Sequence, residues 1–342
     1  MKKKTLLTIA IISGVMTLTL VGLGVVFDKE DLEKQHGRTD IYDVSVDGTI
    51  AYVFYKEGHP GIYLNNLSEP VVQLEANLEI VDISFSPNGK NLIYSSNDKN
   101  KREMLNSQIF MINLDTKAEK ELFQEETLIT EVKYHPTNSD YIYYLKAGTF
   151  QNYSPIASAR PHDIDLFSFQ ISNGETKQYT DLKKYMIHSL QLSKRENAAY
   201  VVMDDDAHAE TAEDIFVSHQ RIFKIVLDEP YGTEVVSPKD SETDIWDFTI
   251  TPDDDYFIYQ AVANTGENGN YQYELFNYNR QSKEVKQLTN LKEHTSHPVI
   301  SADGQSVYFI VDTQFGKSKP DYELYKMNID GSSIVEVPLA MN

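Results

Sequence analysis

Short apolar runs alternate with polar turns along this chain, and the apolar runs recur in a fixed order. An aliphatic residue followed by an aromatic one occurs six times, each time with a second such pair 11 to 24 residues later. The first pairs are Ala51-Tyr52, Ile93-Tyr94, Ile142-Tyr143, Ala199-Tyr200, Ile258-Tyr259 and Val307-Tyr308. The second pairs are Ile62-Tyr63, Ile109-Phe110, Leu166-Phe167, Ile222-Phe223, Leu275-Phe276 and Leu324-Tyr325. Such a register predicts one supersecondary unit repeated six times.

Each repeat has the pattern of four short strands. In the second repeat, the alternating run 81–86 suits a strand with one buried face, and the turn 87–90 contains Asn-Gly. Further strands are expected at 91–95, 108–114 and 119–123. Four antiparallel strands in each of six units predict an all-β fold, a six-bladed β-propeller. We expect the aromatic residues of the second and third strands to pack between neighbouring blades.

Closure of the ring follows from where the repeats begin and end. Each end of the repeat region supplies a complete blade, so no strand is left over to be shared between the first and last blades. We therefore expect the ring to close through packing of the first blade against the sixth.

The repeats also carry a family resemblance. Segments 85–96 with 108–123, and 300–311 with 323–337, resemble the WD-type repeat of TolB-like propellers. In that repeat a Ser-Pro-Asp-Gly-Lys turn precedes an aliphatic-aromatic strand, an Ile-Tyr strand and a terminal Leu-Thr, which Gln287-Leu288-Thr289 matches. The resemblance implies the propeller fold over residues 40–342. TolB has an additional α/β domain before its propeller, for which residues 28–39 are too short, so a role in a Tol–Pal system is not implied.

The N-terminal segment has the pattern of a membrane anchor. Three lysines at positions 2–4 precede an uncharged stretch of 23 residues from Thr5 to Phe27. A membrane span needs about 20 apolar residues, whereas a signal-peptide core has about 7–15. The lysines should keep the N-terminus in the cytoplasm. We expect an uncleaved signal-anchor at 1–27, a stalk at 28–39 and an extracytoplasmic propeller at 40–342. The alternative is a secreted protein cleaved near Gly22.

Charge and cysteine content exclude several function classes. The formal net charge is −21, which would repel nucleic-acid phosphates, and we expect no nucleic-acid partner. The chain has no cysteine, which excludes disulfides, thiolate metal sites, cysteine nucleophiles and a lipoprotein anchor.

The inner strands supply the candidate binding residues. Alignment of the turns places six residues at one equivalent position at the start of the first strand: Ile41, Asp82, Glu131, Ser189, Asp247 and His297. Residues of the opposite parity are mostly apolar and should pack between blades, so this position should face the central channel. We expect Asp82, Glu131, Asp247 and His297 to form a channel mouth that could hold a cation or a basic group. Alternatively, they hydrogen-bond neighbouring blades and channel water.

Loop lengths vary mainly on one face of the predicted propeller. The longest loops between second and third strands are Lys146–Asp163, Met203–Gln220 and Gln260–Gln272, on the same face as the channel mouth. Long loops on a rigid scaffold are usual binding sites, although neutral insertions would give the same lengths. Tyr153, Pro155 and Ile156 in the first of these loops favour protein binding.

Other chemical signals are weak. The chain has no nucleophile elbow, zinc-protease motif, phosphate-binding loop or EF-hand. The triplets Asp204–Asp206 and Asp253–Asp255 could attract calcium, and no other cofactor is expected. His294 and His297 share no helical face, and Trp246, the only tryptophan, is expected in the core.

The sequence thus favours a membrane-anchored propeller that binds a protein or a cell-envelope component through its long-loop face. The alternative is a hydrolase or lyase acting on envelope glycans or peptides, with Asp82, Glu131 and His297 as acid and base groups. The fold alone does not decide between these two functions.

Overall fold

The computed structural model describes most of the repeat region. It describes residues 34–341, apart from 101–105, 149–161, 183, 208, 212–213, 215–216, 229–231, 240, 267–268 and 318, and before them only residues 13, 14, 16, 17 and 19. Within this described part, no helix is long and apolar enough to cross a membrane. Most of the expected anchor at 5–27, residues 28–33 of the expected stalk, and Tyr153, Pro155 and Ile156 lie outside the described residues.

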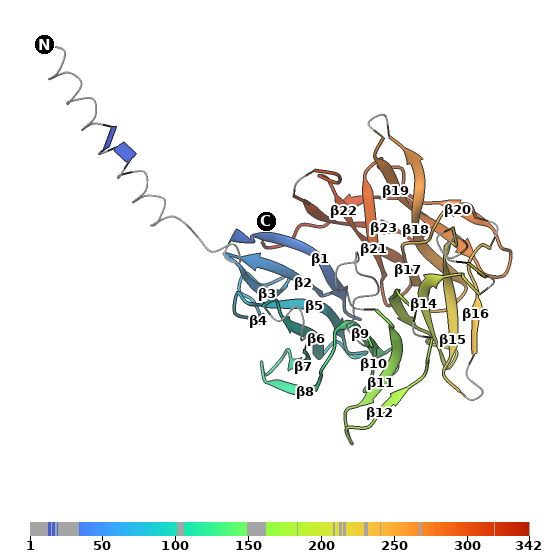
Figure 1. The fold of residues 1–342 in the computed structure, drawn as a ribbon, viewed down its shortest axis with the longest axis horizontal. Coiled ribbons are helices and arrows are strands. Elements are labelled where there is room, and N and C mark those ends of the chain that lie inside the picture. The colour runs from blue at the N-terminus through green and yellow to red at the C-terminus, as the bar shows by residue number, and fades with distance from the viewer. Residues whose placement is uncertain are drawn as a thin grey trace, which may run out of the picture.

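The described chain forms six four-stranded antiparallel units arranged around a centre (Figure 1). Blades 1 and 2 contain β1 (Gly37–Val44), β2 (Ile50–Lys56), β3 (His59–Leu64), β4 (Val72–Gln73), β5 (Leu78–Phe85), β6 (Asn91–Asp98), β7 (Ser107–Asn113) and β8 (Glu119–Glu125). Blades 3 and 4 contain β9 (Ile129–His135), β10 (Asn138–Lys146), β11 (Asp165–Gln170), β12 (Thr176–Gln178), β13 (Ile187–Leu192), β14 (Ala198–Asp204), β15 (Gln220–Val226) and β16 (Gly232–Val235). Blades 5 and 6 contain β17 (Asp247–Ile250), β18 (Tyr256–Thr265), β19 (Tyr271–Asn279), β20 (Val285–Gln287), β21 (His294–Ile300), β22 (Ser306–Asp312), β23 (Tyr322–Asn328) and β24 (Val335–Glu336). The predicted all-β architecture is confirmed, and β1 begins at Gly37, so its first three residues lie in the expected stalk.

Blades 5 and 6 are joined at the long-loop face. Strands β18 and β19 continue to a pairing of Thr265 with Tyr271, so most of the loop expected at Gln260–Gln272 is a strand hairpin instead. The extension brings Tyr273 beside His294, where the two blades form a parallel bridge. The backbone N–H of Tyr273 also donates to the carbonyl of Glu293 at 3.0 Å. The eight strands of these blades therefore form one continuous sheet.

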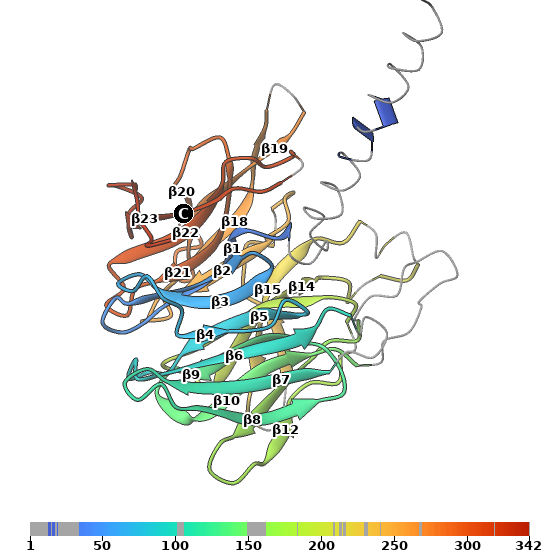
Figure 2. The same cartoon turned by 90° about the vertical axis from the view of Figure 1, so that its left-hand side faces the viewer.

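The hydrophobic core consists of six clusters, one at each junction between neighbouring blades. At the junction between blades 6 and 1, Tyr52 and Phe54 pack with Tyr308 and Leu324. No strand is shared there, because β1 to β4 form a sheet of their own. The ring therefore closes by packing, as the sequence predicts. Figure 2, turned by 90° from Figure 1, shows β1 to β4 beside the strands of blade 6.

Stacked aromatic pairs lie across the second and third strands of five blades. With ring centroids 5.2 to 5.9 Å apart, they are Tyr52–Tyr63, Tyr94–Phe110, Tyr144–Phe167, Tyr259–Phe276 and Phe309–Tyr325. Tyr143, Tyr200 and Tyr308 lie one residue out of this register, so the expected fixed register is wrong in blades 3, 4 and 6. Middle strands are buried on both faces, so an apolar dipeptide does not reveal which face each residue takes.

Candidate functional site at the channel mouth

The four residues predicted at the channel mouth line one cavity of about 610 Å³ on the long-loop face. Asp82 belongs to β5, Glu131 to β9, Asp247 to β17 and His297 to β21, so four blades contribute. Each of the four lies on the inner strand of its blade. The structure therefore brings together all four predicted site residues.

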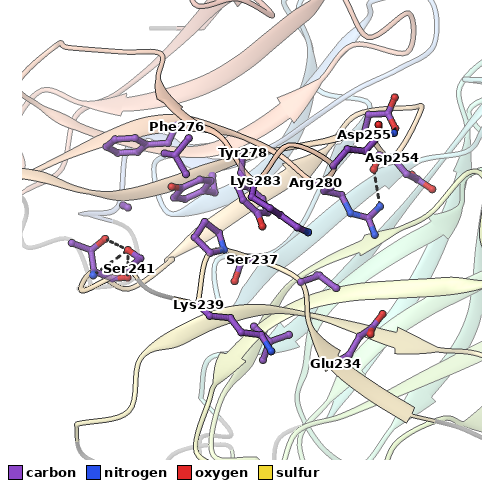
Figure 3. Close-up of a pocket in the computed structure, with 18 of the residues that line it drawn as sticks. Glu234, Ser237, Lys239, Ser241, Asp254, Asp255, Phe276, Tyr278, Arg280 and Lys283 are labelled. Atoms are coloured by element: carbon purple, nitrogen blue, oxygen red, sulfur yellow. Dashed lines mark hydrogen bonds between the residues drawn. The ribbon is translucent and has the colours of Figure 1, made fainter.

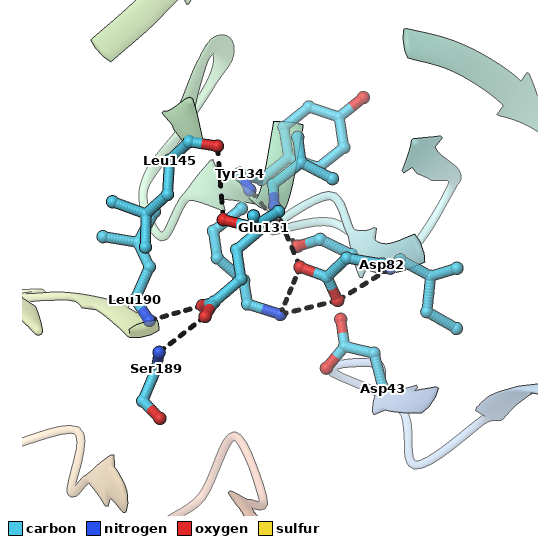
Figure 4. A network of polar contacts seen from close by, with 12 residues as sticks. Asp43, Asp82, Glu131, Tyr134, Leu145, Ser189 and Leu190 are labelled. Carbon is cyan, nitrogen blue, oxygen red and sulfur yellow. Dashed lines mark hydrogen bonds and ion pairs between the residues drawn. The ribbon is translucent and has the colours of Figure 1, made fainter. Parts of the chain in front are cut away.

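Carboxylates of this ring join neighbouring blades (Figure 4). Asp82 accepts a hydrogen bond from the backbone N–H of Val132 in blade 3 at 2.9 Å. Glu131 accepts from the N–H groups of Ser189 and Leu190 in blade 4, both at 2.6 Å. Each carboxylate satisfies backbone donors that lack a partner on that edge of the next blade.

The remaining junctions have comparable contacts. Asp247 accepts from the Ser189 hydroxyl at 2.7 Å and from the His297 N–H at 3.0 Å. The Tyr42 hydroxyl donates to the carbonyl of His297 at 2.6 Å, and Asp43 accepts from the N–H of Phe85 at 2.7 Å. These contacts show that the ring residues form hydrogen bonds between blades, which is the alternative expected from the sequence. Ligand binding by the same residues stays a prediction.

Two ring positions depart from regular strand geometry. Ser189 and His297 have φ angles of 58° and 50°, in the left-handed region that side chains other than glycine rarely adopt. Both lie at register shifts of their inner strands. Neither position has a glycine or another sequence signal for this conformation. Backbone strain of this kind is often found at functional sites.

Lys133 is a candidate site residue in the channel that the sequence interpretation missed. Its Nζ lies 3.2 Å from Asp82. Burial disfavours its charge, but Asp82, Asp43 and Glu131 more than compensate and raise the pKa of Lys133. Lys133 is two residues beyond Glu131 on β9 and so points into the same channel. That parity was the signal that could have identified it.

Burial raises the pKa of two channel carboxyls. The pKa of Glu131 rises to about 7, because burial and the charge of Asp82 outweigh Lys133 and the two backbone hydrogen bonds. The pKa of Asp43 rises to about 6, again through burial first, against the opposing charge of Lys133. These two carboxyls therefore titrate in the range in which acid–base groups act at neutral pH.

An aromatic wall faces the channel mouth from blades 5 and 6. Trp246 packs edge-on against Tyr273 at 6.3 Å, and Tyr273 packs against His294 at 4.7 Å. His294 in turn stacks on Phe315 at 4.2 Å. Trp246 is 40% exposed, so its expected place in the core is wrong. It lies just before β17, in the lining of the channel-mouth cavity.

Exposed apolar side chains are concentrated on the same face. Those at the starts of inner strands or in loops between second and third strands are Tyr185, Met186, Val217, Trp246, Tyr271 and Phe315. They make up more than half of the large exposed hydrophobic residues in the described part of the chain. An apolar patch rimmed by polar residues is typical of a binding surface.

A larger cavity of about 1170 Å³ lies away from the channel, between blades 4 and 5 (Figure 3). Its walls include Ser237 and Lys239, after β16, and Tyr278 and Arg280 of blade 5. Arg280 donates to the carbonyl of Asp254 at 2.6 Å and lies 5.2 Å from the Tyr200 ring centre. The charges around it are mixed in sign, and the sequence interpretation did not identify it.

The two acidic triplets are partly engaged. Asp206 forms an ion pair with Lys184, and Asp253 accepts a hydrogen bond from Thr251 at 2.5 Å, within its own turn. In the part of the chain that the structure describes, no group of three or more His, Asp or Glu side chains is placed to hold a metal ion. Calcium binding at either triplet stays a prediction.

Comparison with solved structures identifies the fold. TolB from Acinetobacter baumannii is similar with a TM-score of 0.57 and 14% identity, over 90% of this chain and 64% of that one. The fold is that of a TolB-like β-propeller. This chain spans less than two thirds of that TolB.

Other similar structures have different functions. An oligogalacturonate lyase from Vibrio parahaemolyticus has a TM-score of 0.56 and 12% identity, over 91% of this chain and 81% of that one. The propeller domain of the Trilobed protease from Pyrococcus furiosus, described as having an open velcro topology, has a TM-score of 0.53 and 15% identity, over 89% and 84%. No family model matches the sequence, and no curated protein does. At sequence identities of 12% to 15%, the similarity to these structures concerns the fold alone.

Proposed function

We propose that this protein is a membrane-anchored extracytoplasmic propeller that binds a protein or a cell-envelope component through its long-loop face. The observation that carries the proposal is the number of exposed apolar side chains on the long-loop face, of which Trp246 and Phe315 line the channel mouth. We call this surface the apolar rim. It consists of Trp246, Tyr271, Phe315, Tyr185, Met186 and Val217. Tryptophan and tyrosine are enriched among the few residues that dominate the binding energy of protein interfaces.

The anchor is the second part of the proposal. Residues 5–27 are uncharged and long enough to span a bilayer, and the three preceding lysines favour a cytoplasmic N-terminus. The propeller would then lie outside the cytoplasm, tethered close to the membrane. A tethered binding module needs only one accessible face, and the long-loop face provides it.

Crosslinking in intact membranes tests the binding function. The full-length chain with a C-terminal tag is crosslinked in membranes of its own organism, purified and analysed by mass spectrometry. We expect one major partner, which the double variant Tyr271→Ser/Phe315→Ser loses. The matched control, Val285→Ser/Val335→Ser, changes two exposed apolar residues on outer strands and should retain it. Equal capture by both double variants would refute the proposed binding face.

An enzyme is the second candidate, and one observation favours it. The Glu131 carboxyl, with its pKa raised to about 7, lies in the same cavity as His297. Against this, both Glu131 oxygens already accept backbone hydrogen bonds. Incubation of the full-length chain with envelope glycan and peptide mixtures, followed by mass spectrometry of the products, tests this function. Turnover that Glu131→Gln abolishes, with the fold intact, would establish it.

A further inference from the structure

We infer that the channel mouth binds a cationic side chain, the guanidinium or ammonium group of a protein partner. The inference rests on the proposed binding function and adds which chemical group enters the cavity. Four features of the lining carry it: two acceptor atoms without a partner among the described residues, a carboxylate that accepts no hydrogen bond from them, the aromatic wall, and the sign of the charge.

Two buried polar side chains in the lining have unused hydrogen-bonding atoms. Gln260 and Ser296 are each only 3% exposed, and both line the cavity. The Gln260 amide nitrogen lies 3.3 Å from Nε2 of His294. Among the described residues, no hydrogen bond to the amide oxygen of Gln260 or to the hydroxyl of Ser296 is found, and both atoms keep contact with the cavity. A ligand that donates hydrogen bonds would satisfy these two atoms in place of water in the cavity.

Asp40 supplies a carboxylate that accepts no hydrogen bond from the described part of the protein. Its carboxylate is 38% exposed and lies 3.9 Å from Nε2 of His297, and it accepts no hydrogen bond from any described residue. Asp82, Glu131 and Asp247 instead accept backbone hydrogen bonds. Asp40 is therefore the carboxylate in the lining that is free to pair with an incoming cation.

The aromatic wall matches the same group. Trp246, Tyr273 and Phe315 line the cavity together with Asp40. Cations bind over aromatic faces, and a guanidinium does so while its N–H groups remain free to donate. Asp40, Gln260 and Ser296 offer acceptors for those donors.

The charge of the lining disfavours an anionic ligand. Lys133 is the only lysine or arginine among the described residues that line the cavity, and Asp82 already pairs with it. An acidic sugar or a phosphate would meet carboxylates and no free cation. A cationic side chain is attracted by the cavity and by the net charge of −21 on the whole chain.

The single tryptophan makes the site measurable. Trp246 is the only tryptophan of the chain and lies in the wall, so ligand binding changes a fluorescence signal that comes from the site alone. The full-length chain in detergent micelles is titrated with three tripeptides, acetyl-Gly-X-Gly-amide, where X is arginine, citrulline or glutamate. Citrulline has nearly the shape of arginine without its charge.

We expect the arginine peptide to bind about tenfold more tightly than the citrulline peptide, and the glutamate peptide to bind more weakly than both. Asp40→Asn should weaken arginine binding by about threefold to fivefold. The control, Glu336→Gln, removes the same charge from the exposed outer strand β24 and should leave binding unchanged. Thermal unfolding of each variant confirms that the fold is retained.

Two results would overturn the inference: equal binding of the arginine and citrulline peptides, or no fluorescence response to the arginine peptide. Equal binding would leave the proposed binding face intact, because the mouth would still be a site for a neutral ligand. The binding face itself fails only in the separate crosslinking experiment with the apolar-rim variants. The two failures are thus distinguishable.

Discussion

Glu131 in blade 3 accepts the backbone N–H of Ser189 in blade 4 at 2.6 Å and so links two blades whose four-stranded sheets are separate. Its second oxygen accepts the N–H of Leu190 at 2.6 Å. A single side chain therefore satisfies two donors at one junction. Comparable links by Asp82 and Asp247 make the channel ring a structural element as well as a candidate site.

Removal of this carboxylate should destabilise the propeller. Glu131→Ala leaves two N–H groups without acceptors and removes a negative charge near Lys133, which we expect to lower the free energy of unfolding by about 3 kcal/mol. Urea unfolding followed by circular dichroism measures the change. The control Glu336→Ala lies on an exposed strand and should change stability by less than about 0.5 kcal/mol. A loss for Glu131→Ala as small as the control would contradict the structural role.

The raised pKa of Glu131 gives its contribution a defined pH dependence. Its pKa is about 7 in the folded protein, against 4.5 for a free glutamate, so folding favours the protonated form. The contribution is fully present below about pH 4.5 and is lost as the pH rises through 7. Histidines whose pKa is lowered by burial, including His188 and His294, oppose this trend in the total stability.

A comparison with Glu131→Gln removes the histidine contribution, because both proteins share it. The free energy of unfolding of the unmodified protein minus that of the variant should fall between pH 5 and pH 8, by at most about 3 kcal/mol. Urea unfolding at several pH values in that range measures it. A difference that stays constant, or that rises with pH, would show that the carboxyl is ionised throughout.

Sequence periodicity was sufficient for the architecture and for the ring position, because strand parity and turn spacing are local properties. Asp82, Glu131, Asp247 and His297 were located in this way, and the cavity contains all four. The register of Tyr143, by contrast, depends on which of two buried faces it takes, and an apolar dipeptide does not encode that choice.

The aromatic wall was not predictable for a different reason. It depends on the extension of β18 and β19 beyond the face, which brings Tyr273 beside His294 of the next blade. That contact joins residues of two repeats, and it depends on the segment Gln260–Gln272, which the sequence pattern predicts to be a loop. Trp246 is expected in the core because tryptophan is a large aromatic residue. Its exposure of 40% depends on its three-dimensional surroundings, which the residue type does not encode.

The left-handed conformation of His297 leads to a third prediction. At a φ of 50°, glycine carries no Cβ penalty, whereas a β-branched residue is strongly disfavoured. We expect His297→Gly to be more stable than His297→Val by about 2 kcal/mol, as measured by thermal unfolding. Val299, in the extended part of the same strand, provides the control, since Val299→Gly should destabilise the protein instead. Equal stability of the two His297 variants would show that the backbone relaxes there.

The absence of cysteine makes membrane topology testable with single labels. Glu336→Cys places one thiol on the exposed strand β24, and Lys3→Cys places one before the apolar stretch. We expect a membrane-impermeant maleimide to label Glu336→Cys in intact cells, and Lys3→Cys only after the membrane is opened, because lysines before an apolar span favour a cytoplasmic N-terminus. The unmodified chain has no thiol and serves as the blank. Protection of Glu336→Cys in intact cells would refute the extracytoplasmic orientation, and its recovery in the culture medium would establish cleavage and secretion.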